Sequence, residues 1–160
     1  MLSAALPIGI GATLVMDVWG LLLRQLGVAT LNFALVGRWA GQLLNGRVRH
    51  QAIAKVEPVR HELAFGWGIH YAIGVQFAML LVVIVGEGWL LSPTLLPALV
   101  VGVVTVVAPL CVMQPAMGAG FFASRTPMPL RNCLKSLVTH FVFGVGLYLS
   151  AERSVRARAL

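Results

Sequence analysis

Long apolar runs alternate along the chain with short polar segments. They cover residues 6–26, 64–85, 93–113 and 134–151, and few charged residues fall inside them. A helix needs about 20 mostly apolar residues to cross the hydrocarbon of a bilayer. The runs are continuous, whereas barrel strands alternate apolar and polar positions. The pattern therefore predicts an all-α fold, a bundle of four transmembrane helices in one domain over residues 1–160.

The composition strengthens the membrane prediction. Hydrophobic residues make up 59% of the chain and charged residues 11%, whereas soluble domains carry about 25% charged residues. A soluble fold of 160 residues could not bury this much apolar surface. The formal charge of +7 is carried by side chains between the apolar runs. There they meet lipid headgroups, so the lipid bilayer is the expected partner and nucleic acid is not.

The basic residues also predict an orientation. Nine of the twelve lie in or beside the first and third loops, residues 27–63 and 114–133. Loops rich in Lys and Arg stay on the cytoplasmic side, which would leave both termini outside. The C-terminal sequence AERSVRARAL, with three arginines, argues against this orientation.

The first loop contains a helical pattern of its own. In TLNFALVGRWAGQLL, apolar residues recur at helical spacing at Leu31, Leu35, Trp39 and Leu43. This predicts a short amphipathic helix, for which two placements stay open. Either the helix lies in the headgroup plane as an interfacial helix, or it docks on the inner end of the bundle. The side chains expected to contact anionic headgroups are Arg38, Arg47, Arg49, Arg125 and Arg131.

Two parts of the chain resemble each other. IHYAIGV at 69–75 and THFVFGV at 139–145 both read His–aromatic–x–x–Gly–Val, and VMD at 15–17 is matched by VMQ at 112–114. The match predicts two pseudo-repeated helical hairpins that run parallel, related by an axis along the membrane normal. Chance or convergent packing is the alternative explanation.

Four polar residues fall at similar depths in these predicted helices. Asp17, His70 and His140 lie about 9–10 Å from the inner ends, at about 1.5 Å per residue, and Gln114 lies at one inner end. Ionisable groups at such depths are costly unless they pair or face water. We therefore expect an inward-facing polar intramembrane site in the cytoplasmic half of the bilayer.

Three interpretations of this site stay open. In the first, the site is a hydrogen-bond network that joins the helices. In the second, it is a path for protons or ions, because imidazole titrates near neutral pH. The third is a haem or metal site, with His70 and His140 as axial ligands and Met16 and Met113 as soft ligands. A glycine four residues after each histidine leaves room for a porphyrin or for a closely packed helix.

Recognisable catalytic motifs are absent. The sequence has no GxSxG, Walker, HExxH or paired ExxH pattern. This favours a non-enzymatic transport, proton-handling or accessory subunit, with a bis-histidine haem or metal redox protein as the alternative. Four short helices enclose little volume, so a homodimer or a place in a larger membrane complex is expected. Pro109 cannot donate to the carbonyl of Thr105, which predicts a kink in the third helix.

Several strings resemble a known family: GATLVMDVWGLLLR, ALVGRWAGQLLNGRVRH, GWGIHYAIGV, PTLLPALVVGVVTVVAPLCVMQPAMGAGFFASRTP and LVTHFVFGVGLYL. The chain resembles the bacterial family of small membrane proteins named domain of unknown function 2938. The resemblance implies a four-span protein of the inner membrane, with periplasmic termini on the orientation above, and it implies no particular activity. The family's motif residues in this chain include Asp17, Arg38, Trp39, His70, Gln114, Pro115, Gly118, Arg125 and His140.

Overall fold

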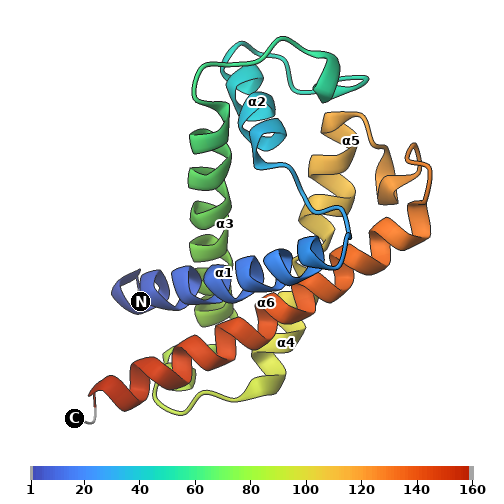
Figure 1. Cartoon of the computed structure of the whole chain (residues 1–160). Helices are drawn as coiled ribbons and strands as arrows, with labels where there is room; N and C mark the ends of the chain where they lie inside the picture. Colours follow the sequence, from blue (N-terminus) through green and yellow to red (C-terminus); the bar gives the residue numbers. More distant parts are fainter. Residues whose placement is uncertain (1, 159–160) are drawn as a thin grey trace. The chain divides into compact units, whose positions relative to one another are not determined.

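The computed structural model describes residues 2–158, which are mostly helical and contain no strand (Figure 1). Short 3-10 helices and turns connect the α-helices in this range, and a π-helix covers Ala108–Met113. The α-helices are α1 (Leu2–Gln25), α2 (Phe33–Leu44), α3 (Glu62–Val85), α4 (Leu95–Val104), α5 (Gln114–Met117) and α6 (Pro129–Arg158).

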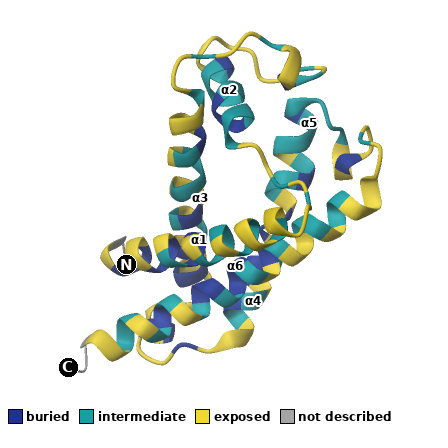
Figure 2. Cartoon of the chain, in the orientation of Figure 1, coloured by how far each residue is buried: buried dark blue, intermediate teal, exposed yellow. Residues whose placement is uncertain are grey.

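Four helical stretches are long and apolar enough to cross a membrane. They are Ser3–Gln25, Glu62–Val85, Leu95–Met117 and Pro129–Ala157. Only 22% to 33% of the most apolar part of each stretch is buried inside the protein, so most of its side chains face outward (Figure 2). A surface this apolar is favourable only against lipid. Within the described residues the all-α prediction is confirmed, and each predicted span is found as a helical stretch long and apolar enough to cross a membrane.

The third and fourth spans extend beyond the loop-side ends that their patterns predicted. The third continues through α5 to Met117, where Gly118 adopts φ 99° and ends the helix. The fourth helix begins at Pro129, whose missing N–H costs nothing in a first turn, and continues to Arg158. The loop between them is correspondingly shorter than predicted.

The third span is interrupted where Pro109 predicted a kink. The helix α4 ends at Val104, and the backbone resumes as the π-helix Ala108–Met113. Proline offers no N–H to the carbonyl of Thr105, so regular α-helical bonding cannot run through this point. In the π-helical segment the backbone hydrogen bonds join residues five positions apart, so the helix continues with a changed bonding pattern.

The chain divides into two compact units. Unit one contains the chain up to Thr30, Tyr71–Thr105 and the chain from Val138 onward. Unit two contains Leu31–His70 and Val106–Leu137.

In unit one, glycines let pairs of helices pack backbone against backbone. A Cβ atom on Gly9 of α1 would lie 2.5 Å from the Cα of Val75 in α3. A Cβ on Gly102 of α4 would likewise lie 2.5 Å from the Cα of Gly144 in α6. Any larger residue would push these helices apart, because real Cβ atoms do not approach so closely. Buried residues gather around these crossings (Figure 2), with Ile8, Leu81, Phe143 and Leu147 almost fully enclosed.

In unit two, the helix predicted in the first loop packs against the start of α3. The Asn32 side chain accepts a hydrogen bond from the Ala34 N–H at 3.0 Å, which caps α2 and explains why it begins at Phe33. A Cβ on Gly37 would overlap the carbonyl of Glu62, and one on Gly66 would overlap the carbonyl of Phe33. The helix α2 therefore packs against α3, while its placement in the headgroup plane or on the inner end of the bundle stays a prediction.

We expect Gly66→Ala to destabilise the protein and Gly68→Ala to leave it unchanged or slightly more stable. Both glycines lie in α3, but only the Cβ added at residue 66 meets backbone, whereas nothing lies within 4 Å of the one at residue 68. The loss expected at residue 66 is about 1–3 kcal/mol, as for other overpacking substitutions. Thermal unfolding of both variants in the same detergent measures the difference, and equal Tm values would contradict the proposed close crossing.

Candidate functional site

The acid inside the first span has a phenol partner. In unit one, Tyr71 Oη donates a hydrogen bond to Asp17 Oδ2 at 2.8 Å. Both residues lie within membrane-spanning stretches, Asp17 in α1 and Tyr71 in α3. A carboxylate at such depth needs a donor to replace the hydration it would lose. Sequence analysis missed Tyr71, although a tyrosine within an apolar span carries a polar tip that seeks a partner.

His140 is held by a threonine of the neighbouring helix. Its Nδ1 lies 3.0 Å from Thr105 Oγ1, and the two residues are 9% and 6% exposed. The threonine hydroxyl has a single proton, which it donates to the Gly102 carbonyl at 2.6 Å. Nδ1 must then be the donor to Oγ1, so in the neutral ring Nε2 carries the lone pair.

His70 lies in an aromatic cluster of unit two. Its ring centroid is 4.5 Å from that of Phe33 and 5.8 Å from that of Trp67. Phe33 and Trp67 also stack on each other at 4.2 Å. Aromatic faces stabilise a neutral imidazole by stacking and a charged one by cation–π attraction. The His70 ring is thus packed among aromatic side chains of α2 and α3.

Gln114, at the start of α5, carries a buried acceptor. Its Oε1 atom is shielded from solvent and has no hydrogen-bond partner among the residues the structure describes. Leaving a buried acceptor unpaired costs about 1–3 kcal/mol. Such a group is uncommon in folded proteins and is often found at functional sites.

The four predicted site residues are divided between the units. Asp17 and His140 belong to unit one, and His70 and Gln114 belong to unit two. The structure identifies a local partner for Asp17, for His140 and for His70. Their convergence around one axis stays a prediction.

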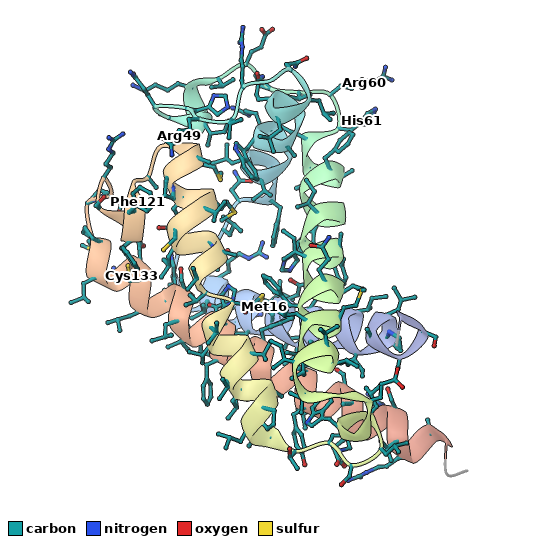
Figure 3. All side chains as sticks on the ribbon, turned by 180° about the vertical axis from the view of Figure 1, so that it is seen from behind. Met16, Arg49, Arg60, His61, Phe121 and Cys133 are labelled. Atoms are coloured by element: carbon teal, nitrogen blue, oxygen red, sulfur yellow. The ribbon has the colours of Figure 1, made fainter. Side chains whose placement is uncertain are left out.

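The predicted metal ligands form no recognisable metal cluster. Within residues 2–158, no group of three or more His, Cys, Asp or Glu side chains is placed to hold a metal ion. Met16, labelled on α1 in Figure 3, packs against the apolar core of unit one. Met113 is the last residue of the π-helix. Haem binding by two histidines alone is a separate prediction that these findings leave untested.

The glycines that follow each histidine have a packing role. A Cβ on Gly74 would overlap Thr13 Oγ1 of α1, and one on Gly144 would lie 2.9 Å from the Ala98 carbonyl of α4. Of the two uses considered for these glycines, the closely packed helix is therefore the one found. The space that each leaves open is filled by a neighbouring helix of unit one rather than left for a porphyrin.

Arg38, predicted as a headgroup contact, holds unit two together. Its Nε and Nη2 donate to the two carboxylate oxygens of Glu62 at 2.8 and 2.9 Å. Nη1 donates to the carbonyls of Ala54 and Val56 at 3.2 and 2.9 Å. Four of the five guanidinium N–H groups are thus used. The hydrogen bonds to Glu62 raise the pKa of Arg38 above its ordinary value.

The other predicted headgroup contacts differ from Arg38. The side chains of Arg47, Arg49 and Arg125 form no hydrogen bond or ion pair with any residue in the described range. The Arg131 side chain reaches only the Met128 sulfur, at 3.7 Å. None of these four guanidinium groups is held by a carboxylate of the described residues, and their contact with lipid headgroups stays a prediction.

Comparison with known proteins finds one family. Residues 6–154 match the family described as "Protein of unknown function (DUF2938)". No curated protein and no solved structure matches the chain. The match covers almost the whole chain and confirms the resemblance noted from its sequence.

Replacing Arg38 by Lys should destabilise the protein. A lysine ammonium cannot bind both Glu62 oxygens and two carbonyls at once, because it lacks the planar fork of guanidinium. We expect Tm in detergent to fall by at least about 2–4 °C, which corresponds to about 1 kcal/mol in a chain of this length. Arg60→Lys is the matched control, since the Arg60 side chain donates only to the adjacent His61. Similar Tm values for both variants would argue against this role of Arg38.

Proposed function

Because the chain belongs to the DUF2938 family, whose function is unknown, we propose a role from its own residues. We infer that it is a small polytopic membrane protein that takes up and releases protons through polar groups within its spans. The observation that carries this proposal is the hydrogen bond from Tyr71 to Asp17. It joins two membrane-spanning helices at the one carboxylate that the sequence places deep in an apolar run.

The geometry of this pair suits a carboxyl group that changes protonation state. When Asp17 is ionised, Oδ2 accepts the phenol proton and part of the negative charge is neutralised by the hydrogen bond. When Asp17 is protonated on Oδ1, Oδ2 can still accept the same bond. Tyr71 therefore orients the carboxyl in both states. A proton can come and go without the two helices losing their contact.

His140 supplies a second proton acceptor in the same unit. Its bond to Thr105 leaves the lone pair on Nε2 in the neutral ring. Protonation at Nε2 would not disturb the bond that Nδ1 donates. In both Asp17 and His140, a side chain of a neighbouring helix thus holds one atom of the titratable group.

The pseudo-repeat gains support from the glycine crossings of unit one. In each proposed hairpin, a glycine of the first helix packs against the His–aromatic–x–x–Gly–Val segment of the second helix. Gly9 meets Gly74 and Val75, and Gly102 meets Gly144. We propose that the two hairpins are copies of one unit. The interruption near Pro109 is then where the second copy departs from the first.

The membrane setting of the proposal follows from the basic loops. We propose that the chain lies in the bacterial inner membrane with the loops around residues 31–61 and 118–128 in the cytoplasm and both termini in the periplasm. Six basic residues and one acidic residue fall in these loops. We also propose that α2 lies at the membrane surface, and that the chain acts as a homodimer or as an accessory subunit of a larger complex.

The proton-handling role predicts that Asp17→Asn removes proton flux. Purified protein is reconstituted in liposomes that contain a pH-sensitive dye, and flux is started by a potassium diffusion potential. We expect the flux through Asp17→Asn to fall to the level of protein-free liposomes, while Tyr71→Phe retains part of it. Asn can still accept the bond from Tyr71, so the fold should survive. Glu57→Gln, at an exposed carboxylate of the first loop, is the matched control and should behave as wild type.

Two results would overturn this role. One is an Asp17→Asn variant that is folded and conducts protons as wild type does. The other is wild-type flux no greater than that of liposomes without protein.

Haem binding is a second candidate function, favoured by the bond between His140 and Thr105. Histidines that bind metals donate their other ring N–H to a neighbouring acceptor, which fixes the ring and directs its lone pair to the metal. The Nδ1 bond of His140 has this form.

An absorption spectrum of the purified protein tests the second candidate. A Soret band that disappears in both His70→Ala and His140→Ala would support ligation of haem by the two histidines. A colourless preparation, free of iron and copper, would eliminate it.

A further inference from the structure

Unit two contains a small cavity beside the end of the third span. Its volume is about 160 Å³, and most of its lining is apolar. Cys111, Val112, Pro115 and Ala116 line it from the third span, and Phe121 from the loop that follows. The remaining lining residues, from α2 and the first loop, are Trp39, Val48 and Arg49. Figure 3 shows Arg49 and Phe121 beside the end of α5.

The walls of this cavity are held in place by specific contacts. The Trp39 Nε1–H donates to the Val48 carbonyl at 2.9 Å, which ties the first loop to α2. The His50 N–H donates to the Ala116 carbonyl at 2.8 Å, which ties the same loop to α5. Gly118 lets the loop approach further, since a Cβ there would overlap the Gln51 carbonyl. The cavity is thus a built feature in which Arg49 lies between two anchored residues.

The cavity combines apolar walls with one unpaired cation. Arg49 is exposed and makes no hydrogen bond or ion pair with any residue in the described part of the chain. The loops around residues 31–61 and 118–128, which contribute lining residues, carry six basic residues and one acidic residue. A ligand that fits both features carries a negative charge on one end and hydrocarbon on the other.

We propose that this cavity binds an anionic phospholipid of the surrounding bilayer. Arg49 contacts the phosphate, and the apolar walls hold the adjoining part of an acyl chain. The volume is below the roughly 300–1,000 Å³ of pockets that enclose a whole small ligand, so the cavity takes one segment of a lipid whose remainder stays in the membrane. Its place at the end of a span puts it at the depth where phosphate and acyl chain meet.

This proposal is independent of proton transfer at Asp17. It rests on residues of unit two, whereas the carboxyl and its tyrosine belong to unit one. It also separates Arg49 from Arg47, which is equally unpaired but does not line the cavity. The two arginines therefore provide a matched pair for the experiment.

Protection of Cys111 from alkylation measures occupancy directly. Cys133→Ser leaves Cys111 as the single cysteine of the full chain, and its reaction with a maleimide is timed in detergent. Phosphatidylglycerol should slow the reaction about fivefold more than phosphatidylcholine does, the ratio expected for one arginine beside an anionic headgroup. Arg49→Gln should abolish the difference between the two lipids, and Arg47→Gln should preserve it. Inorganic phosphate alone should give no protection.

Three outcomes would overturn the proposal. Equal protection by both lipids would mean that the headgroup charge is not recognised. Equal behaviour of Arg49→Gln and Arg47→Gln would mean that Arg49 does not form the site. Protection by inorganic phosphate alone would assign the cavity to a soluble anion. Unchanged circular dichroism of both variants ensures that a difference reports binding rather than unfolding.

Discussion

Close contact between helix backbones is the constraint on which the rest of the structure depends. Lipid tails are as apolar as leucine, so helices inside a bilayer gain little from hiding apolar side chains from each other, and van der Waals contact decides how they pack. Gly9 and Gly102 provide that contact in unit one, and Gly37 and Gly66 provide it in unit two. Bulkier side chains at these positions would separate the helices, and the polar pairs that depend on those separations would be lost.

The polar groups of unit one use this closeness. Asp17 and His140 are each held by a direct hydrogen bond with a side chain of another helix. Such a bond forms only when the two helices lie close enough for the two side chains to meet. In a low-dielectric interior such bonds are strong, and unpaired groups are correspondingly costly. In the proposed proton-handling role, the same hydrogen bonds would also orient the groups that exchange the proton. Substitutions that keep the hydrogen bond, such as Asp17→Asn, therefore test that role separately from the packing.

Unit two shows how a basic loop acquires defined structure. Arg38 uses its guanidinium to join α2, the first loop and the start of α3, while Trp39 and His50 anchor the loop that follows. Arg38, which uses four of its five guanidinium N–H groups, holds the fold, whereas the guanidinium of Arg49 bonds to none of the described residues. The positive charge of the chain therefore has two separate physical roles, which charge counting alone cannot distinguish.

The sequence by itself determined the helical class, the four spans, the helix of the first loop and the break near Pro109. These follow from local properties: hydropathy over about 20 residues, helical spacing, and a proline that lacks its N–H. The sequence also identified Asp17 and His140 as polar residues within apolar helices. Only the tertiary structure decided that their partners are Tyr71 and Thr105, that Arg38 binds Glu62, and that Arg49 borders a cavity. Such pairings join residues that are 24 to 54 positions apart, and they depend on how helices cross, which no local pattern encodes.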